Sequence, residues 1–234
     1  MAELILPLDQ PSQREALALV DAMGEGVSFY KVGLELFTRE GPGVVRALHG
    51  RRKRVFLDLK LHDIPNTVAG AVRAAAELDV ELLTVHAGGG RAMLEAAAEA
   101  ARDTADGALR LLAVTVLTSL SEEGLGESWG RGIDDVGAEV LRLAELAKAS
   151  GIDGVVSSAH EVAGLRRTLG PDAVLVTPGI RLPGGDAHDQ ARVATPDTAV
   201  ADGADYLVVG RAITGARDPH AALAAVLESM GAAV

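Results

Sequence analysis

The sequence predicts an α/β fold, a single (β/α)8 barrel of the TIM type that occupies one domain, residues 1–234. Short apolar runs of β type recur eight times, and Ala- and Leu-rich segments with helical periodicity separate them. The runs are almost continuously apolar, as parallel strands are when both faces of their sheet are covered. Eight strand–helix units also match the usual barrel length of about 250 residues. The structural alternative is a doubly wound open sheet, but the first run is not followed by the Gly-x-Gly-x-x-Gly turn of that fold.

Each element of the barrel can be assigned to a segment of the chain. The expected strands are 3–9, 27–33, 54–60, 81–87, 110–118, 153–158, 173–180 and 205–211. The clearest helical periodicity lies in 13–23, 67–78, 90–103 and 135–150. The tract SEEGLGESWGRG at 121–132 is expected to be a loop, either a lid that closes over ligand or a solvated connection. No Pro-, Ser- or Gly-rich linker divides the chain, which supports one domain.

Composition excludes several classes of function. The chain is 48% hydrophobic, and its net charge of −11 argues against binding of nucleic acid or of an anionic membrane. It has no cysteine, and its six histidines show no zinc-binding spacing, so no metal site is expected. His62 and His86 either line a site or are structural. No apolar run could span a bilayer, and the N-terminus lacks the basic region of a signal peptide. We therefore expect a cytoplasmic protein that binds a small molecule.

The segment FLDLKLHDIPNTV at 56–68 brings three charged residues to the end of the third expected strand. Asp58 and Lys60 are two positions apart and so project from the same strand face, whereas Asp63 follows where the chain turns. Lys31, at the end of the preceding strand, extends the array to alternating Lys and Asp. Carboxylates keep such a lysine protonated, so it would act as a general acid and not as a Schiff-base nucleophile. The alternative is a structural salt bridge that closes the barrel mouth.

A second group of residues, near the C-terminus, is suited to an anion. The Gly- and Pro-rich segment at 177–193 carries Arg181 and Gln190, and a helix is expected to begin at Arg211 after Gly210. The unpaired N–H groups and positive dipole end of a helix start favour an anion. Barrels often bind phosphate in the loops after strands seven and eight. The alternative is a turn with a solvated arginine.

The motif LDLKLHDIPNTV (57–68) resembles the signature of the orotidine 5′-phosphate decarboxylase family, bacterial type, within the ribulose-phosphate-binding barrel superfamily. Asp-x-Lys-x-x-Asp alone is shared with sugar-phosphate relatives in that superfamily, but its continuation as Ile-Pro-Asn-Thr is highly specific. The other segments that resemble the family, in its order and over essentially the whole chain, are LPLD (6–9), FYKVGLELF (29–37), VTVLTS (114–119), VTPGIR (176–181), the loop DQARV (189–193) and VVGRAIT (208–214).

The resemblance implies a carboxy-lyase that decarboxylates orotidine 5′-phosphate to uridine 5′-phosphate and CO2 without a cofactor, the last step of de novo UMP synthesis. It implies that Lys60 protonates C6 of the pyrimidine while Asp58 lies beside the departing carboxylate. It also implies a homodimer in which Asp63 and Thr67 reach into the active site of the other subunit. The further substrate contacts that it implies are Asp9 and Lys31 at the ribose and the charged array, Thr118 and Ser119 at the pyrimidine, Pro178, and Arg181, Gln190, Gly210 and Arg211 at the phosphate.

Two other functions remain as alternatives. A metal-dependent keto-sugar-phosphate decarboxylase or aldolase of the same superfamily would use the acidic motif to bind Mg²⁺. A catalytically silent barrel would instead bind a phosphorylated ligand, although such a protein would have no need of Lys60 poised between Asp58 and Asp63.

Overall fold

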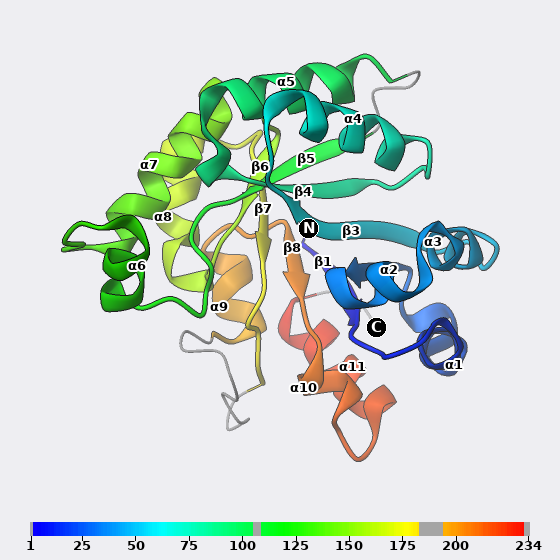
Figure 1. Ribbon diagram of the computed structural model, residues 1–234. Coiled ribbons are helices and arrows are strands. Elements are labelled where there is room, and N and C mark those ends of the chain that lie inside the picture. The colour runs from blue at the N-terminus through cyan, green and yellow to red at the C-terminus, as the bar shows by residue number, and fades with distance from the viewer. Residues whose placement is uncertain (1, 105–108, 183–193, 232–234) are drawn as a thin grey trace.

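The computed structural model describes residues 2–104, 109–182 and 194–231. Its eight parallel strands follow one another in chain order around a closed barrel, and β8 pairs with β1. The helices surround this barrel on its outer side (Figure 1). The strands are β1 (Glu3–Leu8), β2 (Phe29–Gly33), β3 (Arg54–Leu61), β4 (Leu82–His86), β5 (Arg110–Val114), β6 (Gly154–Val156), β7 (Val174–Thr177) and β8 (Tyr206–Val208). The predicted (β/α)8 fold and all eight expected strands are confirmed.

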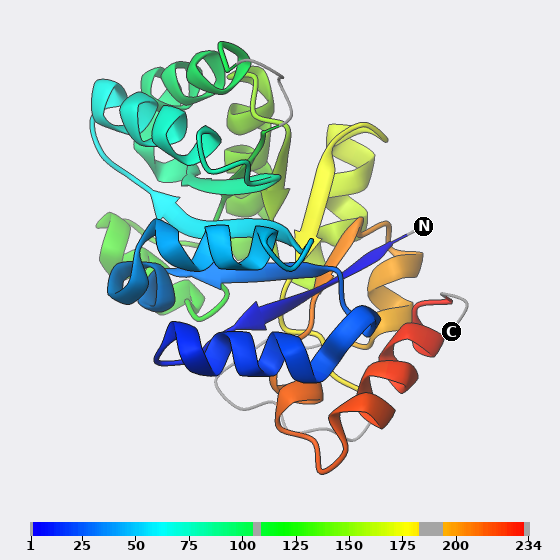
Figure 2. The ribbon, with the colours of Figure 1, turned by 90° about the vertical axis from the view of Figure 1, so that its right-hand side faces the viewer.

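The helices follow the strands and cover them. They are α1 (Gln13–Met23), α2 (Leu34–Glu40), α3 (Pro42–His49), α4 (Pro65–Ala76), α5 (Gly90–Arg102), α6 (Glu122–Trp129), α7 (Val136–Ala149), α8 (Ala159–Leu169), α9 (Pro196–Ala201), α10 (Arg211–Thr214) and α11 (Pro219–Ser229), with 3-10 turns η1 (Gly24–Gly26) and η2 (Ala87–Gly89). Figure 2 shows β1 and β2 side by side, with the first and last helices, α1 and α11, on the same side of the barrel. None of the helices in the described parts of the chain has the length and apolar character that a membrane crossing requires.

The expectation of a loop at 121–132 is wrong, because most of this tract forms α6. The hydroxyl of Ser121 caps the helix by accepting the N–H of Gly124. Leu125 is buried against the core, and Gly130 ends the helix in the left-handed conformation that glycine tolerates. The two glycines within Glu122–Trp129 had weakened the helical pattern, but the cap and the buried leucine outweigh them.

The core has two layers, one on each side of the barrel wall. Side chains alternate between them along each strand, so that Leu82 of β4 packs inside the barrel and Leu83 packs against the helices. The residues that fill the barrel interior are Ile5, Phe29, Phe56, Leu82, Leu112, Val174, Val176, Tyr206 and Val208. This packed interior leaves room for ligand only at the ends of the strands.

The amino end of the barrel is closed by ion pairs. Glu81 accepts hydrogen bonds from Arg54 at 2.6 and 2.7 Å and from Arg110 at 2.6 Å. Arg110 also donates to the hydroxyl of Tyr206 at 2.7 Å. Burial opposes ionisation of Glu81, but the two guanidinium groups prevail and lower its pKa. These residues link the starts of four strands, β3, β4, β5 and β8, so the other end of the barrel is the one available for chemistry.

Candidate active site

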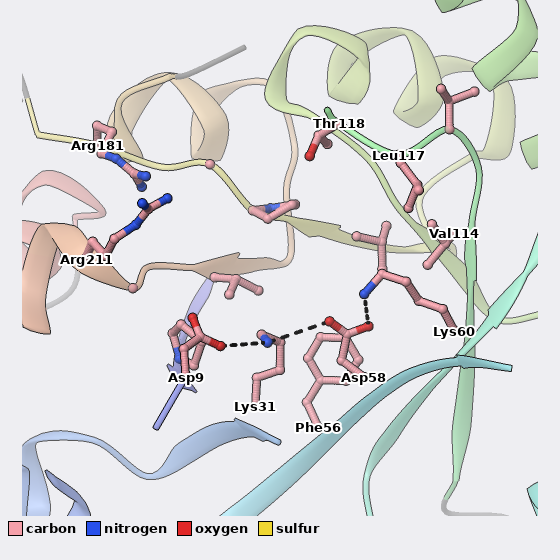
Figure 3. Close-up of a pocket in the computed structure, with 17 residues that line it drawn as sticks. Asp9, Lys31, Phe56, Asp58, Lys60, Val114, Leu117, Thr118, Arg181 and Arg211 are labelled. Atoms are coloured by element: carbon pink, nitrogen blue, oxygen red, sulfur yellow. Dashed lines mark hydrogen bonds and ion pairs between the residues drawn. The ribbon is translucent and has the colours of Figure 1, made fainter. Parts of the chain in front are cut away.

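A cavity of about 250 Å³ opens at the carboxyl end of the barrel, where barrels of this type place their chemistry (Figure 3). Each strand except β4 contributes lining residues, either from its carboxyl end or from the loop that directly follows it. They are Pro7, Asp9, Lys31, Phe56, Asp58, Lys60, Val114, Val116, Leu117, Thr118, Val156, Pro178, Gly179, Arg181, Val208, Gly210 and Arg211. Most of the residues that the sequence singled out therefore line one cavity.

Four charged side chains of alternating sign cross the floor of this cavity. Lys60 Nζ lies 2.7 Å from Asp58 Oδ1, and Lys31 Nζ lies 3.7 Å from Asp58 Oδ2. Lys31 Nζ also lies 3.5 Å from Asp9 Oδ1. Asp58 and Lys31 are largely buried, each with 14% of the side chain exposed, so their charges are poorly screened by water. The array within the subunit is Asp9–Lys31–Asp58–Lys60, in which Asp9 takes the place that the resemblance implies and Asp63 takes no part.

The strand that carries Asp58 and Lys60 is irregular. The pairing of β3 with β4 shifts between Leu57 and Leu61, and Lys60 has a φ of 50°, which is unusual for a residue with a side chain. The side chains of Asp58 and Lys60, expected on the same strand face, do meet, but across this irregular stretch and not along a regular strand. Gly33 leaves space for the array, because a Cβ on it would lie 3.1 Å from Lys31 Nζ.

One wall of the cavity is apolar. The residues that form it are Phe56, Val114, Val116, Val156 and Val208. Sequence reasoning did not assign them to the site, because apolar residues at the ends of strands look like any other core residues. Such a wall suits a flat ring.

Two arginines stand at the other end of the cavity from Lys60 (Figure 3). Arg181 is only 8% exposed, and its guanidinium group donates to the carbonyl of Ile180 at 2.8 Å. Burial, together with the charge of Arg211, lowers the pKa of Arg181. Gly210 must lack a side chain here, since a Cβ would lie 2.9 Å from Pro7 Cγ. The helix that starts at Arg211 has only four residues, so its dipole is small and the guanidinium groups supply most of the positive field.

The remaining expected site residues are placed as follows. Thr118 and Pro178 line the cavity, whereas Ser119 is exposed next to it and does not. Asp63 and Thr67, which follow the carboxyl end of β3, are exposed and also do not line it. Gln190 lies outside the described residues.

Two histidines, His62 directly after β3 and His86 at the end of β4, form a pair beside the site. The rings of His62 and His86 stack with centroids 5.1 Å apart and planes at 14°. Burial, with the charges of His62 and Lys60, lowers the pKa of His86, and its Nδ1 accepts the N–H of Gly88 at 3.1 Å. Neither ring lines the cavity, which favours a structural role for these two histidines over a role in binding.

The carboxylates of the cavity are engaged by ammonium groups. Both oxygens of Asp58 have a lysine partner, Lys60 on one and Lys31 on the other. Within 2–104, 109–182 and 194–231, no group of three or more His, Cys, Asp or Glu side chains is arranged to hold a metal ion.

Comparison with known proteins identifies the family. The family model described as "Orotidine 5'-phosphate decarboxylase / HUMPS family" matches residues 2–226. A protein named orotidine 5′-phosphate decarboxylase from Moorella thermoacetica is 49% identical over 229 residues, which are 96% of this chain and 90% of that protein. A protein of the same name from Halorhodospira halophila is 52% identical over 231 residues, which are 98% of this chain and 96% of that protein. The crystal structure of orotidine 5′-phosphate decarboxylase from Lactobacillus acidophilus superposes with a TM-score of 0.87 at 38% identity, covering 99% of this chain and 100% of that one. The chain therefore belongs to the orotidine 5′-phosphate decarboxylase / HUMPS family.

Proposed function

We propose that this protein decarboxylates orotidine 5′-phosphate to uridine 5′-phosphate and CO2, without a metal or other cofactor. One observation carries the proposal: an ammonium group, Lys60 Nζ, lies 2.7 Å from the buried carboxylate of Asp58 inside a cavity that ends in two arginines. The relatives that share about half of the sequence are named for this reaction. The reaction belongs to pyrimidine biosynthesis.

Loss of CO2 leaves a carbanion at C6 of the pyrimidine, which the ring stabilises poorly. The barrier must therefore fall through charges arranged in advance for the transition state. Lys60 supplies a positive charge where the carbanion forms and then donates a proton to C6. Asp58 lies beside the carboxylate of the substrate and repels it, and this repulsion ends when neutral CO2 departs. Lys31 holds Asp58 from the other side and keeps the array in place.

The rest of the substrate extends along the cavity. The pyrimidine packs on the apolar wall and contacts Thr118 and Ser119. Asp9 and Lys31 hold the ribose. The phosphate-binding residues are Arg181, Gln190, Gly210 and Arg211, with Pro178 as a further substrate contact. Two arginines held close together, one of them buried, favour a ligand with two negative charges such as a phosphate monoester.

The proposal is tested by following the ultraviolet absorbance of orotidine 5′-phosphate with and without EDTA. We expect turnover that the chelator leaves unchanged, because ammonium groups already occupy both oxygens of Asp58. Turnover that EDTA abolishes and Mg²⁺ restores would instead support the metal-dependent alternative. No turnover, with a phosphorylated ligand still bound, would support the silent binding barrel.

We further propose a homodimer whose active sites are completed by Asp63 and Thr67 of the other subunit. These two residues are exposed and lie off the cavity of their own subunit. Ile64, next to Asp63, is 67% exposed, and Leu34, which directly follows β2, is 61% exposed. Two large apolar side chains beside the barrel mouth are costly in water and are expected to be covered by a second copy of the chain.

Mixing two inactive variants tests this dimer. Lys60→Ala and Asp63→Ala are each expected to be inactive alone, but equimolar refolding of the two should restore about a quarter of wild-type activity. Half of the random dimers combine the two variants, and one of the two sites in each carries both native residues. If Asp63 served its own subunit, every mixed site would keep one defect and no activity would return. Analytical ultracentrifugation of the wild-type protein supplies the control for dimerisation.

We also infer that residues 1–234 form one barrel domain and that the enzyme works in the cytoplasm. The pairing of β1 with β8 closes the sheet over nearly the length of the chain, and a protein without cysteine suits a reducing compartment.

A further inference from the structure

Thr84 is a buried polar residue in the middle of β4, and it does not line the cavity. Its exposed fraction is 0%. It lies two positions after Leu82, which packs inside the barrel, so its side chain is on the inner face of the wall. Most buried hydroxyl groups are hydrogen-bonded within the protein, because they have no access to water. The hydrogen-bond partners of Thr84 are Lys60 and Asp58, two residues of the charged array.

The first partner is the backbone of Lys60. Leu57 pairs with Leu83 and Leu61 pairs with Val85, so three residues of β3 face the single residue Thr84. A bulge of this kind takes backbone groups away from the ladder of hydrogen bonds. The N–H of Lys60 instead donates to Thr84 Oγ1 at 2.8 Å. The threonine hydroxyl thus replaces a backbone acceptor at the residue whose φ is 50°.

The second partner is the carboxylate of Asp58. Thr84 Oγ1 donates its one proton to Asp58 Oδ1 at 3.0 Å, because a carboxylate can only accept. The same oxygen accepts a hydrogen bond from Lys60 Nζ at 2.7 Å. The backbone of Lys60, the hydroxyl of Thr84 and the carboxylate of Asp58 therefore form a closed ring with the ammonium group. This ring fixes both the carboxylate and the origin of the lysine side chain.

We infer that Thr84 is a positioning residue for the decarboxylation, which holds Asp58 and the left-handed backbone of Lys60 in the geometry that the reaction needs. The inference rests on the proposed function. Thr84 touches no substrate, so its effect is exerted on the chemical step and not on binding. A small displacement of reacting groups costs about 100-fold in rate, which sets the scale of the effect.

The test compares variants with and without the hydroxyl. Thr84→Val has nearly the same shape and is expected to lower kcat by about 10- to 100-fold with little change in KM, because the ribose and phosphate contacts are untouched. Thr84→Ser keeps the hydroxyl and should retain most of the wild-type kcat. Thr115→Val is the matched control, since Thr115 is also buried and its hydroxyl has no hydrogen-bond partner among the described residues. Thr84→Ala serves as a second variant should Thr84→Val fail to fold.

A second measurement does not depend on activity. The amide of Lys60 should resist hydrogen exchange by NMR in the wild type and in Thr84→Ser, and should exchange at least about tenfold faster in Thr84→Val and Thr84→Ala. The inference would be overturned, while the proposed function stands, by either of two results. One is a wild-type kcat in both Thr84→Val and Thr84→Ala; the other is an exchange rate of the Lys60 amide that these variants leave unchanged. If the wild type did not decarboxylate orotidine 5′-phosphate, the proposed function would fail, and the positioning of catalysis by Thr84 would fail with it. The exchange data would then still report whether Thr84 holds Lys60.

Discussion

Replacing Lys60 by alanine is expected to lower kcat/KM for orotidine 5′-phosphate by at least about 10⁴-fold, while the protein stays folded. Lys60 has two tasks in the proposed mechanism, since its charge stabilises the carbanion and its proton completes the product. Its side chain is 38% exposed and packs into no core, so its removal should not unfold the barrel. The measurement is the ultraviolet assay, with circular dichroism and thermal denaturation to show that the fold is kept.

Two further variants make this result specific. Lys60→Arg keeps a positive charge but holds its protons too tightly to act as an acid, so it should be nearly as inactive as Lys60→Ala. Lys148→Ala is the control, because Lys148 lies at the C-terminal end of α7 and its Nζ donates to the carbonyl of Leu169 at 2.8 Å. This variant should keep wild-type kcat. A Lys60→Ala protein that turned over at a near-normal rate would remove Lys60 from the role of proton donor.

The barrel and most of the cavity could be predicted because the information lies in short stretches of sequence. A parallel strand covered on both faces is a continuous apolar run, and the polar residue that ends it marks the rim of the barrel. Asp9 and Asp58 follow such a run directly, Lys31 follows Phe29 and Tyr30, and Arg211 follows one after Gly210; the structure gathers all four into one cavity. Their convergence needed no knowledge of register, only the rule that parallel strands end at the same rim.

The network around Lys60 could not be predicted in the same way. Thr84 stands within the run LLTVH, where a threonine is an ordinary strand residue and signals nothing. Its role arises from the two extra residues that β3 inserts opposite it, and one sequence does not reveal which residue of one strand faces which residue of the next. The contact of Gly210 with Pro7 is hidden for the same reason, since it joins the first strand to the last.

Replacing Arg211 by alanine is expected to lower kcat/KM for orotidine 5′-phosphate by about 10- to 100-fold, the cost of losing one charged hydrogen bond of about 1.5–3 kcal/mol. The same change should leave turnover of the bare nucleoside, orotidine, nearly unaffected, because the nucleoside has no phosphate to hold. The loss should appear in kcat as well as in KM, since binding energy from a remote group also serves to position the reacting part. Steady-state kinetics with the two substrates gives both comparisons.

Arg217→Ala is the matched control for this prediction, because it removes the same charge six residues further on at a position that does not line the cavity. It should affect neither substrate. Arg181→Ala should, like Arg211→Ala, lose activity on the nucleotide and not on the nucleoside, and the double variant should lose more activity on the nucleotide than either single variant. The reason is electrostatic: burial and the charge of Arg211 lower the pKa of Arg181, so an anion that contacts both guanidinium groups stabilises both charges. Equal losses on nucleotide and nucleoside would show that Arg211 holds the barrel together and does not hold a phosphate.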